Sequence, residues 1–431
     1  MNRRDFLITA SAAALAPQVS FARSQFELVA EPVEAQILPA EEYAATQSFG
    51  FNGGLPGPEI RTRQGQPLEV LLRNKLNEGT AVHWHGIRLP NAMDGVPVLT
   101  QKIVDPDATH TYQFSPPDAG TFWYHSHYLS HEQVARGLMG PLIIEETTPP
   151  DVDHDITAVL ADWRLDQNGQ LTDDFATMHD IAHGGRMGNF ARAFLPDVPL
   201  KTGERIRLRL INAATDRIFP LSLSGIKGKI VALDGMPLTA ARDFETIELA
   251  PAQRVDIIAD AEATLEITMA TRGGSYPLGQ IDPVGSTEPR TIPIPVLSPN
   301  KVPRPGGVAQ ELVLTMQGGA MGGRHGGDNI WAFNDLSDMQ PAPFASFSRG
   351  ETARLRLVNE TSFPHGIHLH GHHFYEVQSD GTLGDLRDTS LVPAGETQDI
   401  LCVFDNPGKW MLHCHMLSHQ AGGMKTWVEV L

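Results

Sequence analysis

The stretch GETARLRLVN, residues 350–359, decides the fold because two other parts of the chain repeat its pattern. GQPLEVLLRN (65–74) and GERIRLRLIN (203–212) have the same length, and both also begin with glycine and end with asparagine. Between those ends apolar and polar residues alternate, which is typical of a β-strand with one buried face. Such repeats indicate copies of one structural unit. We therefore predict an all-β protein of three Greek-key β-sandwich or barrel domains in tandem.

The length and the proline-rich segments agree with three units. A chain of 431 residues accommodates about three domains of roughly 150 residues each. TTPPDVDHD (147–155) and PIPVLSPNKVPRPGG (293–307) read as linkers, since proline disfavours central strands. We expect domain 1 at 23–148, domain 2 at 155–295 and domain 3 at 307–431. A segment within domain 2, DDFATMHDIA, favours a short helix.

The N-terminus has the pattern of an export signal. MNRRDFLITASAAALA carries a twin arginine, Arg3 and Arg4, before an apolar run, and SFA (20–22) suits a cleavage site. We predict a twin-arginine signal peptide at 1–22 and a periplasmic or otherwise exported protein; a short amphipathic helix is the alternative. The run is too short to cross a bilayer, so we expect no membrane anchor after the signal is removed.

Charge and cysteine content exclude several classes of protein. The formal net charge of −18 argues against nucleic acid or an anionic membrane surface as the main partner. The chain has 2 cysteines, Cys402 and Cys414, which cannot build a disulfide framework in a protein of this size. We expect a monomer that acts on small molecules.

Histidine pairs distinguish the outer repeats from the middle one. HWHG begins at His83, nine residues after Asn74, and HLHG begins at His368, nine residues after Asn359. The middle repeat has LSLS at the matching place. In GTFWYHSH and GKWMLHCH, a second pair starts five residues after a glycine in each outer unit. The four pairs are His83/His85, His125/His127, His368/His370 and His413/His415.

Strand geometry predicts two kinds of metal site from these residues. Alternate side chains of a strand share a face, so each pair points one way, and facing outer domains would bring eight imidazoles together. Cys414 then points away from its two histidine neighbours, toward His365, His419 and Met424. Two imidazoles, a thiolate and a weak thioether indicate blue copper. A structural zinc site would more often need additional cysteines.

With HWHG, WYHSH, HGIHLHG and HCHMLSHQAGGM, the chain resembles the multicopper oxidases, the three-domain laccase-like family, over nearly all of its mature length. The resemblance implies cupredoxin-like domains and four copper ions per chain. It assigns type 1 copper to His365, Cys414, His419 and Met424, and type 2 copper to His83 and His368. The type 3 pair takes His85, His125 and His415 on one ion, and His127, His370 and His413 on the other. Domain 2 would hold no copper.

The resemblance also implies catalytic roles for two residues, and the chain departs from the family pattern at one position. Asp94 in NAMDG matches the acidic residue that aids proton delivery, although Asp-Gly is also a turn signal; Cys414 would pass electrons to its histidine neighbours. Some bacterial cuprous oxidases have a carboxylate where this chain has Gln420, and an amide cannot donate a proton in the same way. We expect His372 and His373 to be supporting or core residues.

The expected activity is one-electron oxidation of a small reducing substrate coupled to reduction of O₂ to water. The donor could be a phenol or amine, or Cu(I). Thioethers suit Cu(I), and methionine and histidine alternate at 178–187 and 316–325, which include Met178, His179, His183, Met187, Met316, Met321 and His325; flexible glycine-rich loops are the alternative. Other readings are a non-catalytic copper-binding or cell-division scaffold relative and a two-domain nitrite reductase, which the complete histidine set and the third repeat disfavour.

Overall fold

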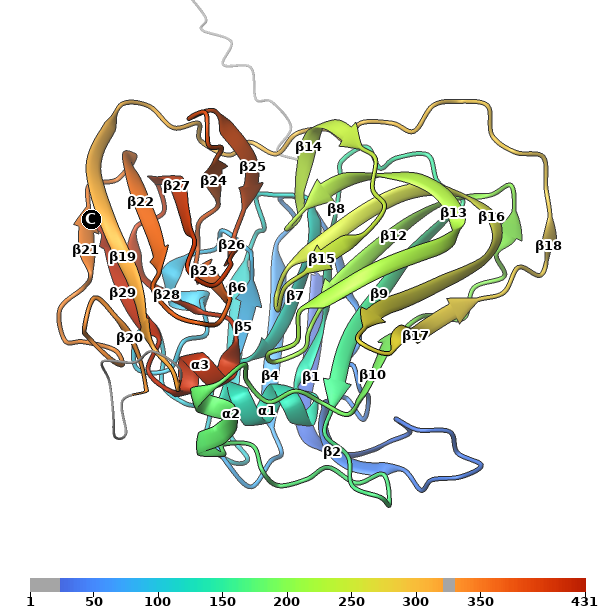
Figure 1. The fold of residues 1–431 in the computed structure, drawn as a ribbon, viewed down its shortest axis with the longest axis horizontal. Coiled ribbons are helices and arrows are strands. Elements are labelled where there is room, and N and C mark those ends of the chain that lie inside the picture. The colour runs from blue at the N-terminus through green and yellow to red at the C-terminus, as the bar shows by residue number, and fades with distance from the viewer. Residues whose placement is uncertain (1–23, 321–329) are drawn as a thin grey trace, which may run out of the picture.

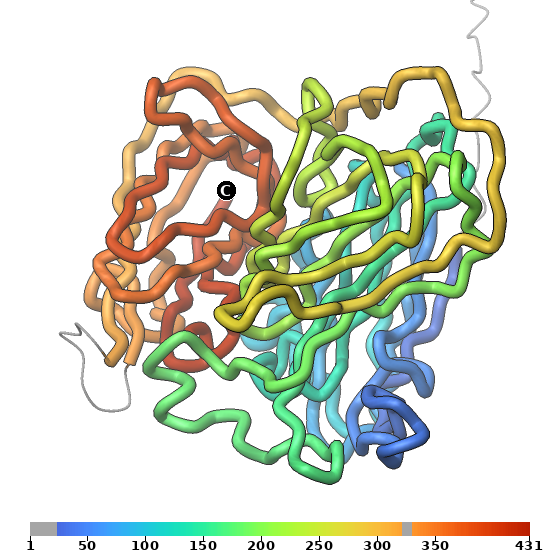
Figure 2. Tube along the Cα trace, turned by 45° about the vertical axis from the view of Figure 1, so that its right-hand side comes forward, coloured from blue at the N-terminus to red at the C-terminus, as the bar shows by residue number. Residues whose placement is uncertain are grey.

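The structure is a computed structural model that describes residues 24–320 and 330–431. Strands dominate it and form three domains, as the repeats predict. Figure 1 shows the first domain in blue and cyan, the middle one in green and yellow, and the third in orange and red. A long connection from β18 (Gly285–Ser286) to β19 (Val308–Gly318) crosses the top of the molecule, as Figures 1 and 2 both show.

The first domain consists of two four-stranded sheets. The first sheet has the order β2 (Thr46–Phe51), β1 (Ser24–Ala35), β4 (Leu68–Asn74), β6 (Thr109–Phe114). The second has the order β3 (Ile60–Arg63), β8 (Met139–Glu145), β7 (Gly120–Ser126), β5 (Val82–His85). The helical turns are η1 (Asn91–Met93) and α1 (Ser130–Arg136). Side chains of both sheets share one buried core.

The middle domain is built on one eight-stranded sheet. Its main path is β10 (Phe190–Phe194), β9 (His154–Trp163), β12 (Arg205–Asn212), β16 (Arg254–Thr271), β13 (Phe219–Leu233), β14 (Met236–Arg242). Off this path, β15 (Ile247–Leu249) pairs with β13, and β17 (Gly274–Ile281) pairs with β16. β11 (Lys201–Thr202) pairs with β18. The expected short helix is α2 (Met178–Ala182), which Figure 1 places beside α3.

The third domain repeats the two-sheet plan. One sheet has the order β20 (Trp331–Phe333), β19, β22 (Glu351–Asn359), β27 (Thr397–Phe404), β24 (Phe374–Val377), β25 (Leu383–Arg387). The other has the order β21 (Ala345–Phe347), β29 (Lys425–Val430), β28 (Gly408–Cys414), β23 (His365–Leu369), β26 (Thr389–Val392). Helix α3 (Leu417–Ala421) follows β28.

The glycine and the asparagine of each repeat have structural reasons. The glycines lie in the left-handed region, Gly65 at φ 76°, Gly203 at 90° and Gly350 at 84°, where other residues are strained. Each asparagine ends its strand at a corner. Asn74, for example, donates its amide to the carbonyls of Glu78 and Val104 and accepts from the N–H of Leu76. Asn212 and Asn359 make the same pattern.

The middle repeat differs from the predicted half-buried strand. β4 and β22 alternate in burial, whereas all eight residues of β12 are buried. Three polar positions of β12 are arginines whose charges are paired, and two of them also reach the first domain. Arg207 lies 2.7 Å from Glu146, and Arg209 donates to the Thr121 hydroxyl at 2.8 Å. The prediction fails here because the second face is covered by another domain and its charges are paired.

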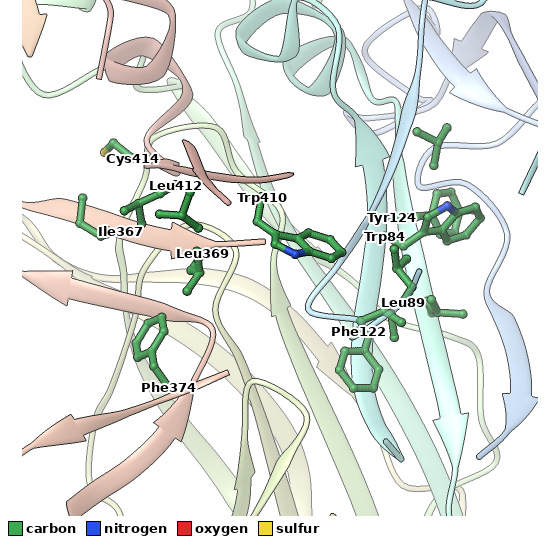
Figure 3. Packing of buried hydrophobic residues seen from close by; sticks show 14 of the residues in the cluster. Trp84, Leu89, Phe122, Tyr124, Ile367, Leu369, Phe374, Trp410, Leu412 and Cys414 are labelled. Atoms are coloured by element: carbon green, nitrogen blue, oxygen red, sulfur yellow. The ribbon is translucent and has the colours of Figure 1, made fainter. Parts of the chain in front are cut away.

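The cores of the first and third domains form one continuous cluster. Figure 3 shows Trp410 lying between Leu412 and Leu369 on one side and Trp84 and Tyr124 on the other. The Trp410 indole donates to the Asn406 carbonyl at 2.8 Å. This packing fixes β28, the strand that ends in Cys414, against the first domain.

Candidate metal centres

The histidine pairs lie on four strands or continue directly past their ends, and the strands are in matching registers. In the first domain, β5 and β7 are antiparallel, with His83 opposite His125. In the third domain, β23 and β28 are antiparallel, with His368 opposite His413 and Ile367 opposite Cys414. The outer repeats therefore present the same constellation from two sides, and Figure 1 shows β5 next to β23 and β28.

The eight predicted imidazoles meet in one buried cluster. The His85 and His368 rings, from different domains, stack with centroids 3.8 Å apart. Ligand atoms of three groups lie within 4.8 Å of one another: His83, His368 and His370; His83, His85 and His125; His127, His370 and His413. The ring of His415 lies 4.9 Å from that of His85 and 5.2 Å from that of His125. None of the eight is more than 7% exposed.

The ring nitrogens of this cluster fit a set of metal ligands. One nitrogen of most rings donates outward to an oxygen: the Nδ1 atoms of His83, His125, His368, His370 and His413 lie 2.8–2.9 Å from backbone or carboxylate oxygens. The Nε2 atoms of His83, His125, His127 and His368 are buried without a hydrogen-bond partner. Orphaned buried nitrogens are costly unless something binds them. Outward hydrogen bonds are what orients metal-bound imidazoles.

His85 presents the opposite ring nitrogen, Nδ1, to the cluster. Its Nε2 lies 3.1 Å from the Asp388 carboxylate, and its Nδ1 is the buried nitrogen without a partner. A metal in the cluster would therefore meet Nδ1 of this residue. Burial lowers the pKa of His85, His125 and His127 well below the ordinary value, and neighbouring imidazoles lower it further. These rings are neutral at pH 7, which is the form that binds metal.

The second cluster gathers His365, Cys414 and His419, all fully buried. The Cys414 sulfur lies 3.6 Å from His365 Nδ1 and 3.7 Å from His419 Nδ1, and the two nitrogens are 3.0 Å apart. The outer nitrogens are held by the Thr361 hydroxyl at 2.8 Å and the His183 carbonyl at 2.7 Å. Burial raises the pKa of the Cys414 thiol, so a metal that binds this sulfur must displace its proton.

Met424 closes the same cluster. Its backbone carbonyl accepts from Cys414 N–H at 3.1 Å, its N–H donates to the His419 carbonyl at 3.0 Å, and the residue is fully buried. Strand alternation separates the two clusters as expected: Cys414 joins one, whereas His413 and His415 join the other. Together with the Met424 thioether, the two imidazoles and the thiolate would match the donor set of blue copper.

Two carboxylates border the eight-histidine cluster, and sequence reasoning identified only one. Asp94 accepts from His370 Nδ1 at 2.9 Å through Oδ2, and its backbone oxygen accepts from His83 at 2.8 Å. Asp388 lies between His85 and His368, and sequence reasoning missed it. Its only signal is an Arg-Asp pair directly before the buried strand β26.

Gln420 lies at the edge of a cavity of about 630 Å³ between the first and third domains. The cavity reaches His127 and is lined also by His131, Met411 and Lys425. His372 and His373 are buried and bonded to backbone carbonyls of residues 370 and 234, which agrees with supporting roles.

The two methionine–histidine segments differ in the exposure of their side chains. The end of α2 lies against the Cys414 cluster, and Met178 is 59% and Met187 38% exposed. The rings of His179 and His183 lie 4.2 Å apart. Met316 is fully buried in the core of the third domain, because β19 turns its side chain inward, so it presents no thioether at the surface. Met321, His325 and the N-terminal signal lie outside the described residues.

No helix within residues 24–320 and 330–431 has the length and apolar character needed to span a membrane.

Comparisons with known proteins agree with this geometry. Family profiles described as multicopper oxidase match residues 33–149, 155–272 and 309–431. The crystal structure of Lac15 from a marine microbial metagenome is 54% identical, with a TM-score of 0.83 over 94% of this chain and 100% of that chain. A multi-copper oxidase from Pseudomonas thermotolerans is 33% identical, with a TM-score of 0.86 over 96% and 100%. Multicopper oxidase MmcO of Mycobacterium tuberculosis is 30% identical over 93% of this chain and 86% of its own length. The chain therefore belongs to the multicopper oxidase family and is a copper-dependent oxidoreductase that uses O₂ as its acceptor.

Proposed function

We propose that the Cys414 cluster is a type 1 copper site and the eight-histidine cluster a trinuclear site. The type 1 ligands are His365, Cys414, His419 and Met424. The type 2 ligands are His83 and His368. The type 3 ligands are His85, His125 and His415 on one ion and His127, His370 and His413 on the other. The observation that carries the proposal is the set of buried ring nitrogens in this cluster that have no hydrogen-bond partner. In His83, His85, His125 and His368 the other ring nitrogen is bonded to an oxygen, which is how metal-bound imidazoles are oriented.

The overall reaction would be one-electron oxidation of a small reducing substrate, coupled to reduction of O₂ to water. Copper bound at the two clusters supplies the redox chemistry. The protein joins the clusters covalently, because Cys414 is bonded through the backbone to His413 and His415. It also excludes bulk water from them, since every proposed ligand is at most 7% exposed.

Asp94 is the proposed proton-handling residue. Its Oδ2 accepts from His370, while its Oδ1 has no hydrogen-bond partner and lies 3.3 Å from His83 Nδ1. That oxygen can hold a proton inside the water-excluded cluster. Gln420 lacks this ability, so the proposal places proton delivery on the Asp94 side.

Two classes of donor remain candidates, a phenol or aromatic amine and Cu(I). Helix α2 favours Cu(I) as the donor. His179 lies on it and His183 directly follows it, with their rings 4.2 Å apart. The exposed Met178 also lies on the helix and the exposed Met187 follows it, and the His183 carbonyl is bonded to a proposed ligand. Soft thioethers and imidazoles suit Cu(I). The assay that separates the classes is oxygen consumption by copper-loaded protein with each donor in turn.

The spectrum of the oxidised protein tests the oxidase proposal directly. Intense blue absorption, a near-ultraviolet type 3 band and about four copper ions per chain are expected. Protein that binds only type 1 copper would contradict the trinuclear site and would favour a non-catalytic copper-binding or scaffold role. We also propose that the protein is exported by the twin-arginine route and acts as a monomer. Recovery of the protein from the periplasm tests export, and the molecular mass of that protein in solution tests the monomeric state.

A further inference from the structure

We propose that Arg254, from the domain that carries no histidine pair, is a positioning residue for the trinuclear site. It acts through Asp388, the carboxylate between His85 and His368. The inference rests on the proposed copper ligands and assigns the middle domain a part in the metal chemistry beyond joining its neighbours.

Arg254 is the side chain at which the three domains meet. Its guanidinium is fully buried and donates to both Asp388 oxygens, from Nη1 at 2.9 Å and from Nη2 at 2.5 Å. Its Nε donates to the Thr121 carbonyl of β7 at 3.1 Å. A bidentate pair of this kind is geometrically specific as well as strong. Arg254 therefore fixes the third-domain carboxylate relative to a first-domain strand.

Asp388 in turn orients two imidazoles, one from the first domain and one from the third. Its Oδ1 lies 3.1 Å from Nε2 of His85, and its backbone carbonyl accepts from Nδ1 of His368 at 2.8 Å. An ionised carboxylate only accepts hydrogen bonds, so it holds the His85 proton on Nε2 and leaves Nδ1 free on the inner side. Asp388 thus selects the tautomer of His85 and the tilt of His368.

Gly86 provides independent support for the importance of this pair. It has φ 83°, and a Cβ built there would lie 2.4 Å from Nη2 of Arg254 and 2.5 Å from Oδ2 of Asp388. The ion pair therefore occupies the space that a side chain at the glycine of HWHG would need. The glycine of HLHG, Gly371, has another reason, because its Cβ would meet the Trp410 ring at 2.4 Å.

Loss of Arg254 should weaken the trinuclear site and spare the type 1 site. Without the guanidinium, Asp388 becomes an uncompensated buried charge that must move or take up a proton, and His85 loses its fixed acceptor. Replacing a group that orients a metal ligand typically lowers metal affinity about 10- to 100-fold. Arg254 and Asp388 make no hydrogen bond to His365, Cys414 or His419 within the described part of the chain.

The test compares the copper-loaded full chain with its Arg254→Met and Arg254→Lys variants. Arg209→Met is the matched control, because Arg209 is also a buried middle-domain arginine that bonds to Thr121, and among the described residues its ion-pair partners are Asp155 and Asp256. The readouts are copper per chain, blue absorption, the near-ultraviolet type 3 band and the electron paramagnetic resonance signal of type 2 copper. Titration with a copper chelator gives the affinity of each site.

The expected result for Arg254→Met is unchanged blue absorption with a loss of the type 3 band and an altered type 2 signal. We expect about 10- to 100-fold easier removal of trinuclear copper, with Arg254→Lys intermediate. Arg209→Met should keep all signals even if it unfolds more easily. Equal spectra for Arg254→Met and Arg209→Met would overturn the inference, as would parallel loss of the blue and type 3 signals.

Gly86→Ala keeps the test decisive if Arg254→Met does not fold. This variant retains both charges and forces them apart, so it should give the same selective loss of type 3 absorption. Unchanged type 3 absorption in Gly86→Ala would overturn the inference. The unmodified protein distinguishes failure of this inference from failure of the proposed function. If it shows no type 3 band, the proposed trinuclear site itself is wrong.

Discussion

His419 donates from Nε2 to the backbone carbonyl of His183 across 2.7 Å. This bond joins a proposed type 1 ligand in the third domain to the surface helix α2 of the middle domain. It places the end of α2 against the Cys414 cluster, with His183 one hydrogen bond away from the buried His419 imidazole. The proposed donor side is therefore formed by two domains.

The methionines around α2 should affect the oxidation of Cu(I) more than that of phenols. Changing both Met178 and Met187 to leucine removes two exposed thioethers and keeps an apolar surface of similar volume. We expect a higher KM for Cu(I) and little change for a phenol, measured as oxygen consumption. Met316→Leu is the control, since Met316 is buried in the core. An unchanged KM for Cu(I) in the double variant would count against a cuprous site on α2.

The two cysteines should differ completely in their spectroscopic effect. Cys414→Ser removes the thiolate that lies 3.6 and 3.7 Å from two imidazole nitrogens, so the blue absorption should disappear while the type 3 band remains. Cys402→Ala serves as the control because Cys402 is also buried in the third domain, but its sulfur donates to the His373 carbonyl and packs in the hydrophobic core. Blue colour that persists in Cys414→Ser would contradict the type 1 assignment.

Asp94→Asn should slow the reduction of O₂ while copper remains bound. The amide oxygen can still accept from His370 Nδ1, but the side chain can no longer hold a proton. Loss of a positioned proton-transfer group typically lowers a rate by about 10²- to 10⁴-fold. The measurement is reoxidation of the reduced protein by O₂, with copper content determined in parallel.

Asp118→Asn is the matched control for Asp94→Asn, because Asp118 is a buried carboxylate of the same domain that pairs with Arg88 instead of a histidine. The proton role would be refuted if the two variants reoxidised at the same rate.

The copper-free protein should lose stability in mild acid. Burial lowers the pKa of nine clustered histidines below 6.5, to about 4 for His419 and about 3 for His413. As the pH falls below 6.5, the unfolded chain therefore binds protons that the folded chain refuses. Each group lowers the free energy of unfolding by about 1.4 kcal/mol per pH unit until its folded pKa is reached.

Three buried carboxyl groups whose pKa burial raises, Asp162, Asp216 and Asp234, act in the opposite direction but are outnumbered. Urea unfolding of copper-free protein at pH 7 and pH 5 measures the difference. His365→Phe removes one of the nine groups and should reduce the pH dependence. Equal stability at both pH values would show that the copper-free clusters are not held neutral.

The sequence alone predicted the domain repeats and the grouping of the histidines, which follow from repeat spacing and strand periodicity, although not the burial of β12. Three Gly-to-Asn strands identified three domains, and matched offsets from Asn74 and Asn359 identified four histidine pairs. Alternation along β28 predicted that Cys414 would separate from His413 and His415, as the structure shows. These predictions succeed because side-chain direction along a strand depends only on local backbone geometry.

Only the tertiary structure revealed features that depend on contacts between domains. Asp388 and Arg254 are about 130 residues apart in sequence and carry no shared motif, yet they form one ion pair beside the histidine cluster. Burial of β12, the inward turn of Met316 and the contact of α2 with the Cys414 cluster also depend on which surfaces meet. A buried charge is stable only beside an opposite charge. Local sequence pattern does not predict which two charged residues become neighbours in the folded protein. The proposed metal-binding residues were therefore readable from local pattern, whereas the Arg254–Asp388 pair beside them was not.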